Sequence, residues 1–320
     1  MNKNLFIIFL IIIISITTLA GKYDVYYEAE VEPVYYGNSD SDIRLDITAD
    51  TDKELDKDTF LTLRGRLLSD EDDTTIKFDR FYLERYEDKL KITAGKQRIY
   101  WGLSQVFNYT DIFNRIDITD TKADHTGVKA LKLLYNTDYF SRIELANEFK
   151  DGKDSFAIRY TKFINGWEYM LNYLDYNNVF DSKDYIFEFK GDIEIGVWGQ
   201  IIRKKTIIDM DLYVLGMDYS WDINYKTLYF MTEYTKNDTL DVDYTYYNAS
   251  YNINMFSSIM LNYMTSSINS KEYYGVSYDY TIDDFQKLTL AYNRFYSFNN
   301  SLVPGNNRDK EFYINWTYSW

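Results

Sequence analysis

The charged side chains of the sequence fall into a basic group and an acidic group that could create an electric field across a channel. The basic group alternates with apolar residues along several short segments. Its members are Arg44, Arg64, Arg66, Arg80 and Lys91. The acidic group follows in one loop, at Asp111, Asp117, Asp120 and Asp124. Opposite charges that face one another across a narrow aqueous opening orient dipolar solutes and set ion preference.

A second interpretation of these charges stays open. The basic residues of one wall could pair with acids of the same wall, such as Asp46 and Glu84. Paired charges largely neutralise each other and contribute little else. In that case the wall would not select ions.

The acidic group lies in the segment 95–125, the longest stretch without sustained alternation of apolar and polar residues. A loop of this length inside a compact fold is usually functional or disordered. Its aromatic residues, among them Trp101 and Phe107, argue against disorder. We therefore expect this segment to fold inward and form the constriction of a channel.

The residues of this loop divide by chemistry into two expected roles. Glycines permit sharp turns, short polar side chains hold turns through bonds to the backbone, and an indole can pin a loop to a wall. The residues expected to anchor the loop are Gly95, Trp101, Gly102, Asn108 and Asp111. The residues expected to contact solute are Gln97, Arg98, Arg115 and Asp117.

The segments on either side of the loop have a hydrophobic period of two. This pattern predicts either an antiparallel sheet with one wet face or a barrel wall that is apolar outside and polar inside. Eighteen strands are predicted, an even number as in bacterial single-chain barrels. They lie at 22–35, 42–50, 58–68, 75–86, 89–94, 126–135, 138–149, 154–163, 166–176, 182–190, 192–203, 208–220, 223–235, 240–252, 254–266, 271–281, 284–296 and 307–320.

The connections between these strands alternate between short and long, as they do in outer-membrane barrels. With the N-terminus in the periplasm, the loop 95–125 falls on the outer side. One inner link, Thr51–Lys57, is longer than the rule prefers. Two breaks in the period predict β-bulges near Asp79-Arg80 and between Ala130 and Leu131, both close to the long loop.

The first twenty residues predict the compartment. Lys3 precedes an apolar run at Phe6–Ile16, which is too short to span a bilayer, and small residues precede Gly21. We expect a signal peptide at 1–20 and a barrel at 21–320, with outer-membrane lipid of a Gram-negative bacterium as its surroundings. No later apolar run could form a membrane helix, so a membrane-spanning chain must be a closed barrel.

A motif in the long loop resembles an element of porin-like outer-membrane families. It consists of Gly95-Lys96-Gln97-Arg98, Trp101-Gly102, Asn108-Tyr109-Thr110-Asp111, Asn114 and Asp117. In families that include alginate-export-like and phosphate-selective-like porins the corresponding run is G-[RK]-Q, W-G, N-x-T-D and N-x-x-D. Tyr109 and Arg115 stand where those families usually have proline. The resemblance implies a passive channel with the loop in its lumen. The alternating C-terminal segment that ends in Trp320 resembles the assembly signal of such barrels.

Other classes of function find little in the sequence. A net charge of −15 disfavours nucleic acid as a partner. His125 is the one histidine, and no nucleophile motif surrounds Ser104, so we expect no enzyme. One histidine and no cysteine predict neither a cofactor nor a zinc site. The acidic runs at 40–42 and 70–73 could hold Ca²⁺ or Mg²⁺ near the outer leaflet, although such runs are more often solvated loops.

The sequence therefore predicts an all-β, transmembrane, antiparallel up-and-down β-barrel of about 18 strands. Its predicted function is that of an outer-membrane porin that passes small hydrophilic solutes or ions. The alternative is a plugged, non-transport barrel that binds a surface polysaccharide or a partner through its outer loops. The sequence does not identify the solute. Trimers are common among porins, but no homo-oligomer interface can be read from it.

Overall fold

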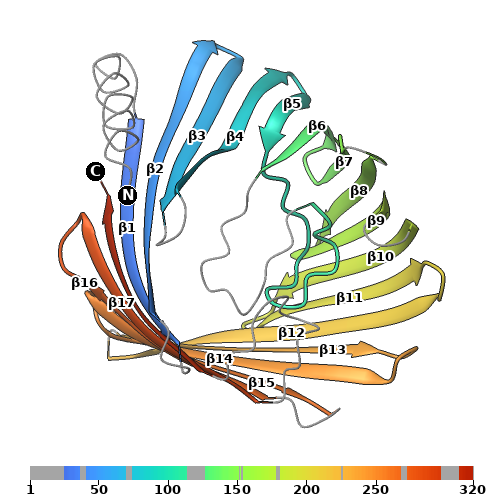
Figure 1. Ribbon diagram of the computed structural model, residues 1–320. Helices are drawn as coiled ribbons and strands as arrows, with labels where there is room; N and C mark the ends of the chain where they lie inside the picture. The colour runs from blue at the N-terminus through green and yellow to red at the C-terminus, as the bar shows by residue number, and fades with distance from the viewer. Residues whose placement is uncertain are drawn as a thin grey trace.

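The computed structural model describes residues 25–36, 41–69, 74–113, 127–150, 152, 154–177, 181–224, 226–267, 272–296 and 310–319 (Figure 1). Regular structure in these ranges is β-strand. The strands are β1 (Val25–Tyr36), β2 (Ser41–Asp56), β3 (Thr59–Ser69), β4 (Thr74–Glu87), β5 (Leu90–Gln97), β6 (Val128–Asp138), β7 (Ser141–Glu148), β8 (Ser155–Ile164), β9 (Trp167–Asn177), β10 (Asp181–Asp192), β11 (Gly196–Lys205), β12 (Met210–Ile223), β13 (Lys226–Asn237), β14 (Val242–Asn254), β15 (Ser257–Ser266), β16 (Glu272–Thr281), β17 (Gln286–Tyr296) and β18 (Lys310–Ser319).

Across the described ranges, no helix is long and apolar enough to cross a membrane. The predicted signal peptide at 1–20 lies outside the described residues.

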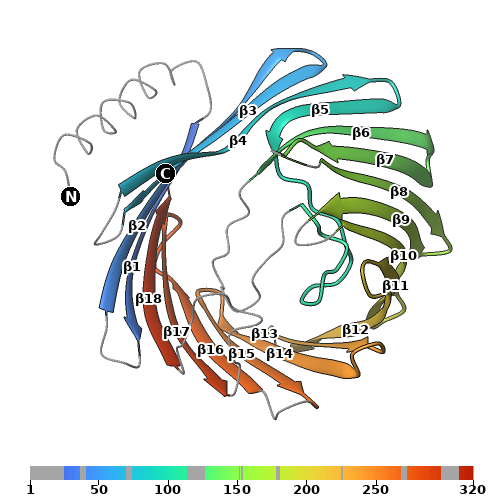
Figure 2. The ribbon, with the colours of Figure 1, turned by 45° about the vertical axis from the view of Figure 1, so that its right-hand side comes forward.

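The strands form one closed cylinder, which Figure 2 shows as a ring. Each strand pairs antiparallel with its neighbours in the sequence. The first and last strands also pair, for example at Val31 with Trp316 and at Tyr35 with Phe312. Closure leaves no free sheet edge to recruit other strands. The predicted 18-stranded up-and-down barrel is confirmed.

The wall of the cylinder has its apolar face outside, the reverse of a water-soluble protein. In β10, Tyr185 and Phe187 are exposed, whereas the alternating Asp184 and Glu188 are 1% and 0% exposed. Phe187 pairs with Leu171 of β9 and Ile201 of β11, and both of these side chains are also exposed. An outer band of this kind is stable against hydrocarbon and aggregation-prone in water.

One end of the cylinder has short turns. The sequence predicted a longer link there at Thr51–Lys57, and this prediction is wrong. β2 continues to Asp56, so its link to β3 is the turn 57–58. The pairing accommodates the extra length through a register shift between Glu54 and Asp56. The side chain of Asp52 also accepts a hydrogen bond from Thr62 on β3, which ties the polar end of the hairpin.

Of the two predicted bulges, the first is confirmed and the second is wrong. The register of β3 and β4 shifts where Arg64 pairs with Arg80 and Gly65 pairs with Phe78, which leaves Asp79 as the extra residue. β5 and β6 instead pair without interruption through Ala130 and Leu131. Ala130 is 3% exposed and belongs to an apolar cluster inside the barrel. The period breaks there because an inward-facing position is also apolar.

The segment after β5 explains that inner cluster. It leaves the wall at Gln97 and enters the ring, where it lies against the inner side of the strands opposite (Figures 1 and 2). Ile99, Trp101 and Phe113 pack there against Ala157 of β8 and Leu174 of β9. Residues 98–113 are called the inner loop below.

Candidate functional site: the inner loop and its attachment to the wall

Two glycines shape the start of the inner loop. Gly95 has φ +129°, and a Cβ there would lie 2.4 Å from the carbonyl oxygen of Phe81. Gly102 has φ +122°, and a Cβ there would lie 1.8 Å from Oδ1 of Asn108. Both positions combine a left-handed backbone with a close approach, so a larger residue would be strained and would clash.

Asn108 holds the two sides of the loop together. Its Nδ2 donates to the carbonyl oxygen of Trp101 at 2.9 Å, and its Oδ1 accepts from the backbone N–H of Asp111 at 3.3 Å. The missing side chain at Gly102 makes room for this amide. The loop-anchoring role that the sequence predicts for these residues therefore has a geometric basis.

The carboxylate of Glu233 on β13 binds the tip of the loop. It accepts the backbone N–H groups of Gln105, Val106 and Phe107 at 3.0, 3.2 and 2.5 Å. It also accepts the indole N–H of Trp198 on β11 at 2.8 Å. Glu233 is 0% exposed, so four donors replace water around a buried charge. Three successive N–H groups form an anion-binding concavity, here filled by the wall itself.

A second buried carboxylate, Glu188 on β10, holds the returning side of the loop. Its Oε1 accepts from Thr110 of the loop at 2.8 Å and from Nε2 of Gln200 at 2.5 Å. Its Oε2 accepts from Arg159 at 3.1 Å and from Asn172 at 2.9 Å. Arg159 also donates to Asn172 at 2.6 Å. The charge of Glu188 is thus balanced by a guanidinium, and its lone pairs are satisfied by three neutral donors.

Trp101 joins this network to the apolar side of the loop. The guanidinium of Arg159 lies 4.8 Å from the centre of the Trp101 ring, a cation–π contact. The ring of Phe113 meets the same indole edge-on at 5.9 Å. Trp101 is 1% exposed. The indole therefore contacts both β8 and the returning side of the inner loop, and its anchoring role stays a prediction.

Tyr100 is the half-exposed side chain beside this cluster. Partial loss of water raises the pKa of its phenol, and the nearby carboxylates of Asp111 and Glu233 act in the same direction. Asn108 and Arg98 lower the pKa of Tyr100, but less than the loss of water raises it. Tyr100 therefore presents a neutral hydroxyl at physiological pH.

The residues predicted to contact solute are placed differently from one another. Gln97 is 2% exposed, and its amide donates to the carbonyl oxygens of Thr93 and Ala130 at 3.0 and 2.9 Å. Arg98 is exposed, and both residues border a cavity of about 190 Å³ with Lys91 and Lys132. Arg115, Asp117 and Asp120 lie outside the described residues.

One predicted wall cation, Lys91, and two further basic residues pair with acids of the same wall. Lys91 of β5 lies 2.7 Å from Glu84 of β4. Further round, Lys132 of β6 lies 3.0 Å from Glu144 of β7, and Arg159 pairs with Glu188. These pairs follow the second interpretation of the sequence, in which charges neutralise one another along the wall.

The remaining predicted cations lie on β2, β3 and β4. Arg64 pairs in register with Arg80, so two cationic positions adjoin. Arg44 and Arg66 lie in β2 and β3, and their side chains lie outside the described part of the structure.

Sequence reasoning missed Glu188 and Glu233 as loop-binding residues. It expected acids on the loop and cations on the wall, whereas the two contacts that fix the inner loop use acids on the wall. A signal was present, since Glu188 lies in the polar phase between Phe187 and Phe189. What the sequence could not supply is the partner, because backbone N–H groups carry no sequence signature.

Comparisons with known proteins give a fold and no family. No family model matches the chain, and no curated protein matches it by sequence. Solved structures do match across almost its whole length, and they are outer-membrane barrels. The chain therefore has the antiparallel up-and-down β-barrel fold that these porin-like outer-membrane proteins have.

Three of these structures show the range of the likeness. OccK11 (OpdR) of Pseudomonas aeruginosa has a TM-score of 0.69 at 9% identity, covering 93% of this chain and 96% of the other. A mutant of the Rh. blastica porin has a TM-score of 0.55 at 12% identity, covering 93% and 100%. Wzi of Escherichia coli, described as a carbohydrate-binding β-barrel involved in group 1 capsule assembly, has a TM-score of 0.63 at 11% identity, covering 96% and 86%. At these identities the likeness concerns the fold alone.

Proposed function

We propose that this protein is a channel of the bacterial outer membrane through which small hydrophilic solutes or ions diffuse passively. The observation that carries the proposal is the attachment of the inner loop inside a closed cylinder. Glu188 of β10 and Glu233 of β13 bind the described part of the loop to the inner face of the wall. An 18-stranded barrel leaves an aqueous channel unless it is plugged.

The outer surface supports the membrane location. Large apolar side chains such as Leu171, Leu215 and Ile201 are more than half exposed on the outward phase of their strands. Lipid satisfies this surface, and water does not. The short-turn end is then periplasmic and the long-loop end extracellular, as in bacterial barrels.

The direct test is reconstitution of the full chain into planar lipid bilayers. A channel gives discrete conductance steps that scale with salt concentration. Loss of steps in protein shown to be inserted, by its resistance to carbonate extraction from liposomes, would contradict the proposal.

A second candidate is the non-transport barrel that binds polysaccharide or a partner through its outer loops. The likeness to Wzi favours it, since that structure is described as carbohydrate-binding. The candidate requires a plugged bore, so inserted protein would bind polysaccharide and show no conductance. The same bilayer recording therefore separates the two candidates.

A further inference from the structure

The inner face of β14–β17 differs in chemistry from the wall that holds the inner loop. The inner loop covers the wall as far as β14, where the ring centres of Phe107 and Tyr244 lie 6.2 Å apart. Beyond that point, the described inward positions of β14, β15, β16 and β17 carry just two charged side chains, Asp279 and Lys287. These two form an ion pair at 3.2 Å, so the face has no net charge.

Asparagines form a row across this face. Asn248 of β14 pairs in register with Asn262 of β15, which pairs with Gly275 of β16, which pairs with Asn293 of β17. Register places the three amides at one level of the inner wall, with Gly275 between Asn262 and Asn293. We call Asn248, Asn262 and Asn293 the amide row.

Two tyrosines from the level above complete the row. Tyr246 donates its hydroxyl to Oδ1 of Asn262 at 2.6 Å, and Asn248 donates its Nδ2 to the same oxygen at 2.6 Å. Tyr273 donates to Oδ1 of Asn293 at 3.0 Å. A Cβ at Gly275 would lie 2.5 Å from the Tyr273 hydroxyl, so the glycine makes room for this bond.

The bonding leaves the Nδ2 donor of Asn262 available to the bore. Both contacts of Asn262 go to its Oδ1, and no described residue bonds to its Nδ2. Its side chain is partly exposed. Sites for small polar ligands usually combine aromatic side chains with a few fixed polar groups, such as an amide with an unused donor.

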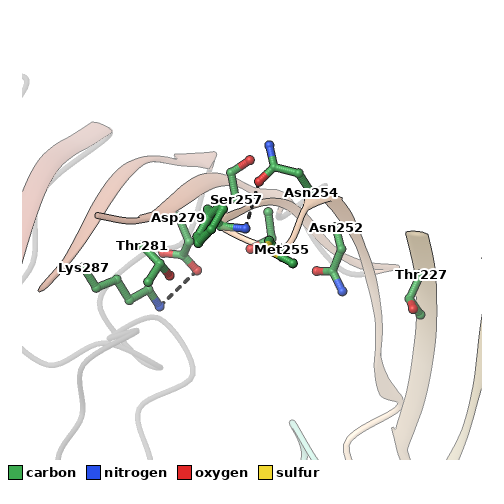
Figure 3. Close-up of a pocket in the computed structure, with 10 residues that line it drawn as sticks. Thr227, Asn252, Asn254, Met255, Ser257, Asp279, Thr281 and Lys287 are labelled. Atoms are coloured by element: carbon green, nitrogen blue, oxygen red, sulfur yellow. Dashed lines mark hydrogen bonds and ion pairs between the residues drawn. The ribbon is translucent and has the colours of Figure 1, made fainter. Parts of the chain in front are cut away.

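The same face continues into a cavity of about 380 Å³ at the short-turn end, shown in Figure 3. Its lining combines amides and hydroxyls, including Asn252, Ser258 and Thr281, with the Asp279–Lys287 pair and with Met255 and Phe256. Asn252 is exposed. The volume lies within the roughly 300–1,000 Å³ of small-molecule sites. The amide row and the cavity therefore lie on one inner face that carries no net charge, with Ser250, Met260, Ser277 and Ala291 at the level between them.

We propose that this surface is a binding track for uncharged polyhydroxylated solutes of the saccharide class, an inference that rests on the proposed channel function. Hydroxyl groups both donate and accept, so such a solute replaces the water on amides and phenols bond for bond. A bare ion entering the same surface would lose water and meet no compensating charge. The track thus favours saccharides over ions of similar size.

The test is block of the ion current by maltotriose in planar bilayers holding the full-length protein. We expect maltotriose to reduce the current with saturating concentration dependence. A polyethylene glycol of similar size accepts hydrogen bonds but donates none through its ethers. We expect the glycol to need a concentration about fivefold higher or more for the same block. This factor corresponds to the free energy of one hydrogen bond.

Variants of the amide row locate the effect. Asn262→Ala is expected to raise the half-blocking concentration of maltotriose about fivefold. Asn262→Asp keeps the acceptor that Tyr246 and Asn248 use, so it serves if the alanine variant fails to insert, and it is expected to weaken block as well. The matched control is Asn136→Ala, an exposed asparagine at the short-turn end of β6 on another part of the wall, which should block like wild type.

Two outcomes separate this inference from the channel function. Conductance steps with equal block by maltotriose and the glycol, or with no effect of either Asn262 variant, would overturn the saccharide track and leave the channel standing. Absence of conductance in inserted protein would overturn the proposed function itself.

Discussion

The carboxylate of Glu233 accepts the backbone N–H of Phe107 at 2.5 Å, although 126 positions separate the two residues in the chain. The contact joins β13 to the tip of the inner loop. Because the bond is to the backbone, it depends on the shape of the loop and not on its side chains. The position of the inner loop is therefore set by a residue of the wall.

Replacing Glu233 by Gln should loosen the tip of the inner loop. A neutral carbonyl would face the three N–H groups in place of a carboxylate, and charge-assisted bonds are roughly twice as strong as neutral ones. A loss of about 2 kcal/mol corresponds to roughly 30-fold faster hydrogen exchange at residues 105–107. Glu87→Gln, at the exposed end of β4, is the control and should leave exchange in the loop unchanged. Equal protection in both variants would show that Glu233 does not hold the loop.

Arg159 and Glu188 should behave as a coupled pair. Arg159→Met leaves a fully buried carboxylate without its cation, which typically costs about 3–5 kcal/mol. The double variant Arg159→Met/Glu188→Gln should cost less than the sum of the two single changes, by about 1–3 kcal/mol. Urea unfolding of the barrel in detergent measures each free energy.

The control for this pair is an exposed ion pair at the sheet surface. Lys183 lies 4.0 Å from Asp175, and both side chains are partly solvated. Lys183→Met should change the unfolding free energy by less than about 1 kcal/mol. Additive effects of the Arg159 and Glu188 changes would argue that the pair does not hold the loop and wall together.

Gly102 should be intolerant of any side chain, for two separable reasons. Gly102→Ala places a Cβ against Asn108 and imposes a left-handed backbone on alanine, at about 1–3 kcal/mol for the backbone alone. Gly152 has a similar φ of +119° with no atom near the position of a Cβ. Gly152→Ala therefore reports the backbone cost by itself. Limited proteolysis should cut the inner loop of Gly102→Ala much faster than that of Gly152→Ala, and equal rates would remove the steric argument.

The fold could be predicted from the sequence because its determinants are local. Alternation such as that of Tyr185, Phe187 and Phe189 with Asp184 and Glu188 is visible residue by residue, and it fixes both strand and face. The extra residue at Asp79 was visible in the same way. The prediction failed at Ala130, where an inward side chain is apolar because it contacts the loop. Alternation of apolar and polar residues shows which face of a strand meets an apolar environment. The prediction took the inside of the barrel to be filled with water, and at Ala130 it is filled by the inner loop.

The candidate site could be predicted in part. Gly102 and Asn108 were recognisable as turn residues, and the structure shows them in mutual contact. The residues of the wall that bind the loop could not be predicted, because Glu233 accepts backbone N–H groups, which nearly every residue possesses. The amide row was also invisible, because Asn248, Asn262 and Asn293 become neighbours only through the register of four strands.

Removing the cation from the Lys91–Glu84 pair should change ion preference. Lys91→Met leaves the carboxylate of Glu84 uncompensated beside the cavity that both line, so cations should be favoured. The reversal potential in a salt gradient measures this shift, which should shrink at high salt as screening increases. The control is Lys236→Met, at the end of β13. The Nζ of Lys236 lies 2.8 Å from Asp238, away from this cavity. An unchanged reversal potential for Lys91→Met would mean that this pair lies off the conduction path.

The central claim, that the inner loop lies in the path of conduction, is tested most directly by one measurement. The chain contains no cysteine, so Gln105→Cys places a single thiol on an exposed residue of the loop tip. Tyr139→Cys places one on a fully exposed turn outside the bore as the control. A charged thiol-reactive reagent added during single-channel recording should lower the current of Gln105→Cys in a discrete step and leave Tyr139→Cys unchanged. A current through Gln105→Cys that stays constant, with labelling of the thiol verified by mass, would contradict the account.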